Sequence, residues 1–137
     1  MTFEEMMKLS NEEKEKTKIH HNNLEHKIQT KCVRWFRLQF PKIAHALFAI
    51  PNAARRSARN GAYMKAEGML PGVADLILLK SNRFYDALCI EIKTQTGRQS
   101  LAQKQWQQFI ESQGSKYIIC RSVQEFQVAI KNYLSDV

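Results

Sequence analysis

The sequence predicts an α/β domain in which helices flank a central, mixed sheet of four strands. Short apolar runs with the composition of strands alternate with longer segments whose apolar residues recur at helical spacing. Turn residues such as Pro and Gly separate many of these segments. A chain of 137 residues, 44% of them hydrophobic, suits one domain with a modest core. The expected order of elements is helix, strand, helix, strand, strand, helix, strand and helix.

The beginning of the chain differs from the rest in charge and periodicity. Residues 1–19 are charged and weakly periodic, and we expect them to form an N-terminal segment, either an appendage or an arm that packs on the main domain of residues 20–137. Ser10 and Glu13 have the spacing of a capping box, so a short helix fits this segment.

Caps and apolar spacing predict the elements of the main domain. A helix that begins at Asn22 or Asn23 should end before Pro41, because the residue before a proline avoids helical geometry. Ser100 and Ser122 each precede a Gln or Glu by three residues, so both should open helices with capping boxes. The other predicted elements are a strand over 45–50, a helix over 55–67 that Gly68 ends, strands near 75–80 and 87–93, and a strand over 116–120.

The charge of the chain favours a polyanionic partner. Lysine and arginine outnumber aspartate and glutamate by 21 to 13, which gives a formal net charge of +8. One cluster follows Pro51, and a second set recurs at three- and four-residue steps along a predicted helix. Both could be ordinary solvated faces, but their occurrence together favours phosphate contact. The first cluster is Arg55, Arg56 and Arg59, and the second is Lys27, Lys31, Arg34 and Arg37.

Several classes of protein are disfavoured. No apolar run reaches the length of a membrane span, and the N-terminal residues lack the apolar core of a secretory signal, so we expect a cytoplasmic protein without a membrane partner. Cys32, Cys89 and Cys120 lie far apart in apolar surroundings, with no Cys/His spacing typical of zinc. We interpret them as buried thiols.

Two carboxylates and a lysine interrupt an apolar pair of strands. Asp75 stands at the mouth of the first strand, and Glu91 and Lys93 share one face of the second because side chains alternate along a strand. If the turn centres near Arg83, antiparallel pairing places Asp75 opposite Glu91. Like charges this close repel unless a cation lies between them, and such oxygen ligands suit Mg²⁺ or Mn²⁺. The alternative is that both are edge-strand acids paired with Lys80 or Lys93.

These residues and others along the chain resemble the VRR-NUC nucleases (virus-type replication-repair nuclease domain), a branch of the PD-(D/E)XK superfamily. The resemblance covers roughly residues 23–134 and implies a restriction-endonuclease-like core. Ala74 stands where the family usually has proline, which stiffens the backbone but contributes no ligand. The motifs are Glu25-x-x-x-Gln29, Pro51-Asn52, Gly72-x-x-Asp75-Leu76, Glu91-x-Lys93, Ser100-x-x-Gln103 with Trp106, and Gly114.

The resemblance implies a metal-dependent DNA endonuclease that uses Mg²⁺, with Mn²⁺ able to replace it. Small single-domain members resemble phage proteins that act as homodimers on branched DNA such as four-way (Holliday) junctions, in the cytoplasm of the bacterial host. The implied metal ligands are Asp75, Glu91, Glu25 and the Ile92 carbonyl, with Lys93 as the catalytic lysine and Gln103 beside the site. The expected DNA contacts are Asn52, Gln29, Arg55, Arg56 and Arg59.

Some of these assignments have structural alternatives. Glu25 could pair with Lys27 or Lys31 on the helix surface. Gln103 could serve only as the cap of its helix, and Asn52 only as a turn residue. Other functions fit the same pattern: a flap or nicking nuclease in repair, or a DNA-binding module without catalysis. An RNA-binding protein is disfavoured, because the aromatic platforms that stack bases are missing.

Overall fold

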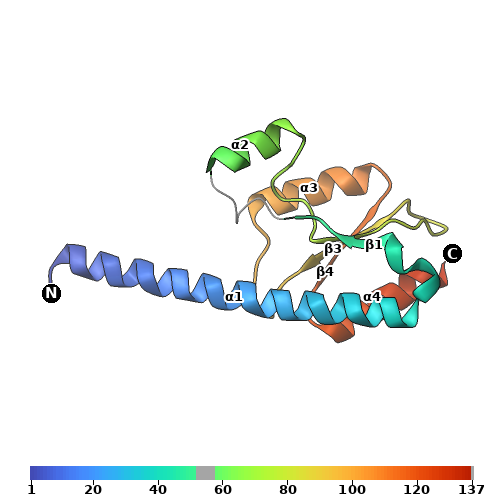
Figure 1. The fold of residues 1–137 in the computed structure, drawn as a ribbon, viewed down its shortest axis with the longest axis horizontal. Helices are drawn as coiled ribbons and strands as arrows, with labels where there is room; N and C mark the ends of the chain where they lie inside the picture. The colour runs from blue at the N-terminus through green and yellow to red at the C-terminus, as the bar shows by residue number, and fades with distance from the viewer. Residues whose placement is uncertain (52–57, 137) are drawn as a thin grey trace.

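A mixed sheet of four strands lies at the centre of the described chain, with α1 and α4 on one side and α3 on the other (Figure 1). The computed structural model describes residues 1–51 and 58–136, and only the backbone of residues 58–60. This arrangement is the predicted fold class. Its elements are α1 (Phe3–Gln39), the 3₁₀-helix η1 (Pro41–Ala46), β1 (Leu47–Ala49), α2 (Ala58–Ala66), β2 (Leu76–Leu78), β3 (Leu88–Ile92), α3 (Leu101–Ser112), β4 (Lys116–Cys120) and α4 (Val123–Ser135).

The strands run in the order β1-β2-β3-β4, which matches their order in the sequence. β1 pairs with β2 and β2 with β3 in antiparallel fashion, whereas β3 and β4 are parallel because α3 connects them as a crossover. Leu76 faces Ile90 across the β2–β3 pair. This is the register expected from a turn centred near Arg83, and its continuation by one residue sets Asp75 opposite Glu91.

The two faces of the sheet bury different sets of side chains. Leu88, Ile90 and Ile92 of β3 belong to the larger core, which α1 supplies with Cys32 and Phe36. α4 completes that core with Phe126, Ile130 and Tyr133. The opposite face packs Cys89 and Tyr117 beneath α3, where Trp106 meets Tyr117 edge to face. Because the residues of β3 alternate between these layers, Glu91 is on the α3 side, as Cys89 is.

The helix predicted to begin at Asn22 or Asn23 begins instead at Phe3 and runs unbroken to Gln39. Thr2 caps it in a capping box with Glu5, so Ser10 is an interior residue rather than a cap. The segment between Phe3 and Gln39 contains no Gly or Pro and is rich in Glu and Lys, which are good helix formers. α1 therefore runs straight through residue 20, and the division of the chain there stays a prediction.

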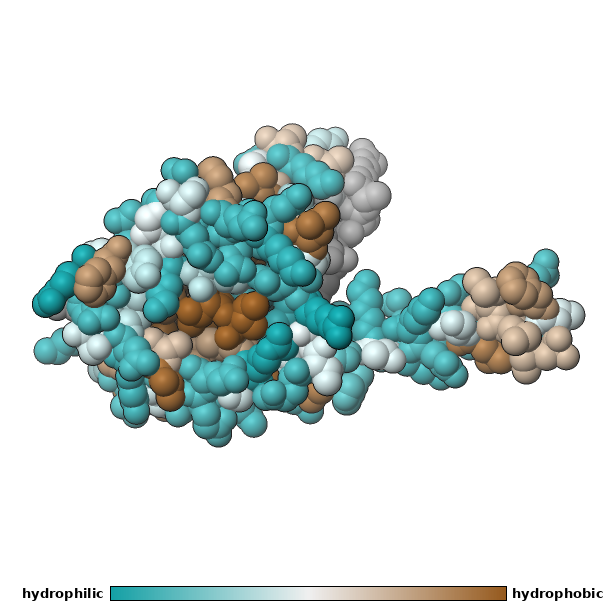
Figure 2. All heavy atoms as spheres, turned by 180° about the vertical axis from the view of Figure 1, so that it is seen from behind, coloured by the Kyte–Doolittle hydropathy of each residue, from teal (hydrophilic) through white to brown (hydrophobic). Residues whose placement is uncertain are grey.

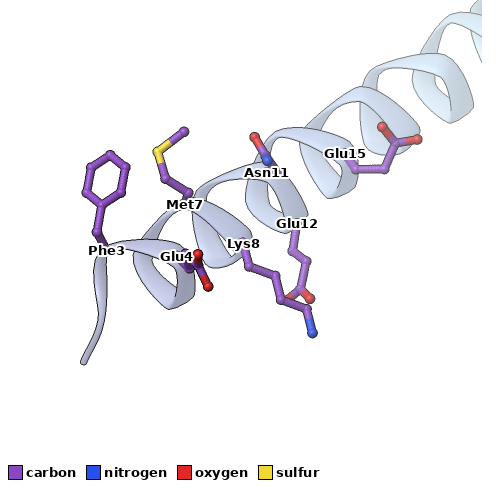
Figure 3. Close-up of a pocket in the computed structure, with 7 residues that line it drawn as sticks. All are labelled: Phe3, Glu4, Met7, Lys8, Asn11, Glu12 and Glu15. Carbon is purple, nitrogen blue, oxygen red and sulfur yellow. The ribbon is translucent and has the colours of Figure 1, made fainter.

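The first half of α1 extends away from the rest of the chain (Figure 1). Every residue from Met1 to His20 is exposed except Ser10, which is half-buried. Apolar side chains gather near its free end in the space-filling view (Figure 2). There Phe3 and Met7 project from one side of the first turns, while Lys8 and Glu12 leave from another (Figure 3). No helix among the described residues is long and apolar enough to cross a membrane.

Several other boundaries differ from the predictions. The strand expected over 45–50 is shortened to Leu47–Ala49, because Pro41 opens a 3₁₀-helix that lasts to Ala46. The helix expected over 55–67 is described from Ala58 to Ala66, and residues 55–57 lie outside the described residues. The glycine expected to end it, Gly68, has a φ of +107°.

The three cysteines are buried and unpaired, as expected. Burial raises the pKa of Cys32 and Cys120 to about 12 and that of Cys89 to about 11. All three thiols are therefore protonated at neutral pH and unsuited to nucleophilic chemistry.

Candidate active site

Asp75 and Glu91 are held together by the β2–β3 pair. Asp75 immediately precedes β2, and its Oδ2 accepts a hydrogen bond of 2.8 Å from the backbone N–H of Ile92. Glu91 is only 3% exposed, although it carries a carboxylate. One of its oxygens, Oε2, is buried and has no hydrogen-bond partner among the described residues. Such an orphaned oxygen is costly, and a simple structural ion pair would not leave it without a partner, so the pair is a candidate functional site.

The two carboxylates are hard to ionise together. Burial is the largest cause that raises the pKa of Glu91, to about 9, and the charge of Asp75 raises it further. Burial also raises the pKa of Asp75, against the hydrogen bond from Ile92 that lowers it. The mutual repulsion predicted from the sequence is thus present in the fold.

Lys93 partly compensates the negative charge of the two carboxylates. Its Nζ lies 3.8 Å from Glu91 Oε1, and this is the one ion pair that the described residues form. The Lys93 side chain is 12% exposed. One ammonium cannot neutralise two carboxylates, so the cluster keeps an excess of negative charge when both acids are ionised.

Glu25 reaches the same cluster from α1. Its pKa is raised, first by burial and then by the charge of Asp75, while the charge of Lys93 lowers it. A contact one turn earlier in α1 fixes this position: His21 Nδ1 lies 2.8 Å from Thr94 Oγ1, directly beyond Lys93. Glu25 therefore faces the cluster, not Lys27 or Lys31 on the helix surface.

Gln103 both caps α3 and contacts the acids. Its Oε1 accepts a hydrogen bond of 2.8 Å from the backbone N–H of Ser100, which closes the capping box. Its Nε2 donates a hydrogen bond of 2.9 Å to Glu91 Oε1. The cap is therefore confirmed, and the second contact places Gln103 against Glu91, where its role in the site stays a prediction.

Gly72 brings the start of α3 close to the acids. It has a φ of +83°, and a Cβ added there would lie 2.5 Å from the carbonyl carbon and oxygen of Ala102 and 2.9 Å from the backbone nitrogen of Gln103. A side chain at this position would have to displace the backbone that carries Gln103. This is the physical reason for glycine three residues before Asp75.

We expect Gly72→Ala to lower the free energy of unfolding by about 2–4 kcal/mol, from the positive φ and the backbone overlap together. Gly68→Ala is the matched control, since Gly68 also has a positive φ but has nothing within 4 Å of an added Cβ. Its expected cost is only about 1–2 kcal/mol. Urea unfolding of both variants checks this, and equal losses would show that the contact with α3 is unimportant.

Beside the acids, the molecule has an open groove of about 1230 Å³. Glu25, Asp75 and Gln103 line it, whereas Glu91 is buried, Lys93 is nearly so, and neither lines the groove. α1 forms one wall with residues between Glu15 and Leu38, and residues 49–51 and Ser100 contribute the rest.

The predicted DNA contacts are only partly described. Gln29 lies in the groove wall on α1. Asn52, Arg55 and Arg56 lie outside the described residues, and so does the side chain of Arg59, which belongs to α2. The basic stripe predicted on α1 is divided: Arg34 and Arg37 line the groove, but Lys27 and Lys31 are exposed elsewhere on the helix.

Two residues near the acids were missed by sequence reasoning. Arg121 follows β4, and its Nη1 donates to the carbonyl oxygens of Thr94 at 2.7 Å and Gly97 at 2.6 Å. It thereby holds the loop after Lys93. The second residue is His21 of α1, whose Nδ1 lies 2.8 Å from Thr94 Oγ1. No motif marked either residue, since each contacts residues that are distant in the sequence.

A divalent cation with oxygen ligands would fit this site. The observation behind this fit is Glu91 Oε2, which lies beside Asp75 and has no hydrogen-bond partner among the described residues. A hard cation would bind such an oxygen. No group of three or more His, Cys, Asp or Glu among the described residues is placed to hold a metal with side chains alone. The remaining ligands would therefore be backbone carbonyl and water, with Glu25 acting through water.

The fold and site define the class of restriction-endonuclease-like α/β domains. The defining features are the mixed sheet, the acid before β2 and the Glu-x-Lys at the end of β3. The family model of the VRR-NUC domain matches residues 10–124. The chain therefore belongs to the VRR-NUC domain family, whose members are nucleases.

Comparison with known structures supports the same fold. A solved structure described as a VRR_NUC domain protein superposes with a TM-score of 0.72 and 22% sequence identity, over 82% of this chain and 88% of the other. No curated protein matches the sequence.

Proposed function

We propose that this chain is a metal-dependent DNA endonuclease that hydrolyses phosphodiester bonds in branched DNA, with four-way junctions as the first substrate to test. The observation that supports the metal dependence is the buried pair of Asp75 and Glu91. Glu91 Oε2 lacks a hydrogen-bond partner among the described residues. The preference for branched DNA is supported by the resemblance to small, single-domain VRR-NUC proteins.

In this proposal the residues have separate tasks. Asp75, Glu91 and the Ile92 carbonyl hold Mg²⁺, or Mn²⁺ in its place, and Glu25 binds through water. The cation supplies an activated water and neutralises phosphate charge when it is bound. Lys93 orients the attacking water or stabilises the charge that builds on the phosphate. Gln103 fixes Glu91 Oε1 by its hydrogen bond, and Oε2, which has no hydrogen-bond partner among the described residues, would be available to hold the cation.

The experiment that tests the proposal incubates labelled linear, flap and four-way junction DNA with the protein in Mg²⁺, in Mn²⁺ and in chelator. Asp75→Asn, purified in parallel, is the matched control. The proposal expects symmetric cutting of junctions only with metal and only by the unchanged protein. Cutting of flaps alone would keep the mechanism but replace the substrate. Binding without cutting, or equal cutting by Asp75→Asn, would contradict the proposed active site.

We also propose that the working form is a homodimer, as the resemblance implies. Two copies related by a two-fold axis would cut two strands of a junction symmetrically. Light scattering of the purified protein measures the mass directly, and a monomer at working concentrations would contradict this part of the proposal.

Gln103→Glu separates the two roles of Gln103. The new carboxylate can still accept from the Ser100 N–H, but it cannot donate to Glu91 and adds a like charge. We expect a nearly unchanged start of α3 and a loss of cleavage of about tenfold to a hundredfold. Gln103→Ala should lose similar activity and also about 1 kcal/mol of stability through the lost cap. Full activity of Gln103→Glu would reduce Gln103 to a cap.

A further inference from the structure

Arg34 and Arg37 lie in the wall of the groove but far from the acids. Both belong to the last turns of α1 and are exposed. Neither forms an ion pair with any described residue. We infer that DNA on one side of the scissile phosphate lies along the C-terminal half of α1, where these two arginines bind its backbone phosphates. The inference rests on the proposed function and adds the position of the bound DNA and the flank that is held more strongly.

The wall is built by one face of α1. Polar or basic residues at three- and four-residue steps line it, and such steps keep side chains on one side of a helix. Its apolar members are few, and the core side of the helix, with Cys32 and Phe36, faces the sheet instead. The residues used in this argument are Lys18, Asn22, His26, Thr30, Arg34 and Arg37.

The spacing along the helix sets the distance from the cut. Arg34 and Arg37 follow Glu25 by nine and twelve residues, which at about 1.5 Å per residue places their backbones about 14 and 18 Å along the axis. Each strand of B-form DNA has one phosphate per about 3.4 Å of helix axis. The arginines therefore match phosphates about four to five nucleotides from the scissile bond.

The charge along the wall distinguishes the two flanks of the bound DNA. Toward the N-terminal end, Glu15 lies one turn before Lys18 in the same wall. Its negative charge offsets the charge of Lys18. Toward the C-terminal end, Arg34 and Arg37 have no acid beside them in the wall. The acids of the wall are otherwise Glu25 and Asp75, which belong to the active site. The flank over the C-terminal half of α1 should therefore be held more strongly.

The same helix offers a control for total charge. Lys27 and Lys31 are exposed cations of α1 that do not line the groove. Replacing them removes as much charge from the same helix as replacing the two arginines does. A general electrostatic effect would respond equally to both pairs, whereas a phosphate site responds only to Arg34 and Arg37.

The test compares Arg34→Gln/Arg37→Gln with Lys27→Gln/Lys31→Gln, both in the full chain that also carries Asp75→Asn. Fluorescence anisotropy measures binding of duplex and junction DNA between 50 and 200 mM salt, with duplex RNA as competitor. Each lost phosphate contact should reduce the salt slope by about 0.9, so the arginine pair should reduce it by about 1.8. Between 50 and 200 mM salt, the protein that keeps both arginines should lose about tenfold more DNA affinity than the arginine variant does. The lysine pair should leave the slope nearly unchanged.

A second measurement locates the contact. With Asp75 intact, the cut position is mapped and the DNA on either side is then shortened. Cleavage should fall when the flank that lies over the C-terminal half of α1 is shortened below about five base pairs. Arg34→Gln/Arg37→Gln should abolish this dependence on flank length. Equal effects of the two pairs, or none from the arginines while DNA is still cut, would overturn the inference alone. A protein that neither binds nor cuts DNA overturns the proposed function with it. Equal competition by RNA through the same arginines would overturn DNA as the occupant.

Discussion

Lys93→Ala should cleave DNA about a hundred to a thousand times more slowly than the unchanged protein. Lys93 is the ammonium nearest Glu91, with Nζ 3.8 Å from Oε1, and its side chain is almost covered. A preorganised cation in a site of low dielectric constant typically contributes this much when it stabilises charge that forms during the reaction. Single-turnover cleavage at saturating protein measures the loss directly, without a contribution from DNA binding.

A matched lysine tests whether the loss is specific. Lys80 follows β2 at the end away from Asp75, so Lys80→Ala removes the same charge far from the acids. It should cleave at nearly the unchanged rate. Calorimetric titration with Mg²⁺ shows whether Lys93→Ala still binds the cation. If Lys93→Ala cleaves within a few-fold of the unchanged protein while Asp75→Asn is inactive, Lys93 is only a counter-charge for Glu91.

Glu91→Gln should abolish cleavage and yet stabilise the metal-free fold at neutral and basic pH. Burial and the charge of Asp75 raise the pKa of Glu91 from an ordinary 4.5 to about 9. The stability that comes from the protonated form is complete below pH 4.5 and is lost as pH rises toward 9. Glutamine stays neutral, keeps an acceptor for Gln103 and avoids the repulsion with Asp75. A gain of about 1–2 kcal/mol, or several degrees in Tm, is the expected size at pH 8.

The pH and metal dependence make this prediction specific. The difference in Tm between Glu91→Gln and the unchanged protein should shrink toward zero as the pH is lowered to 5. Added Mg²⁺ should raise the Tm of the unchanged protein more than that of the variant, because only the former presents two carboxylates to the cation. A variant that is less stable at every pH would show that the Glu91 carboxylate supports the fold rather than straining it.

The sheet and the acids were predictable because they depend on local spacing. Alternation along β3 placed Glu91 and Lys93 on one face, and a turn near Arg83 set the register that brings Asp75 opposite Glu91. The start of α1 was predicted wrongly, because Asn22 and Asn23 resemble caps in a sequence whose true cap, Thr2, is far upstream. Residues without a tertiary contact give no periodic signal, even where they are helical.

Other parts of the site depend on tertiary packing that no spacing reveals. The position of Glu25 depends on where α1 crosses the end of β3, and His21 fixes that crossing through Thr94. The two roles of Gln103 follow from the close approach of Gly72 to α3. Which members of the basic stripe line the groove depends on which face of α1 packs on the sheet. A helix face can be predicted from apolar residues, but the neighbours of its polar edge cannot.

The long α1 helix is one structural element with two levels of stability. Between Ile28 and Phe36 its backbone is shielded by the sheet and α4, so its amide protons should exchange with solvent only when the domain unfolds. From Phe3 to His20 the helix rests on its own hydrogen bonds and its Thr2 cap, and isolated helices of this length are marginal in water. Its amides there should exchange far faster. The junction between the two regimes lies at His21 and Glu25, so fraying of the free half ends one turn before it would reach the candidate active site.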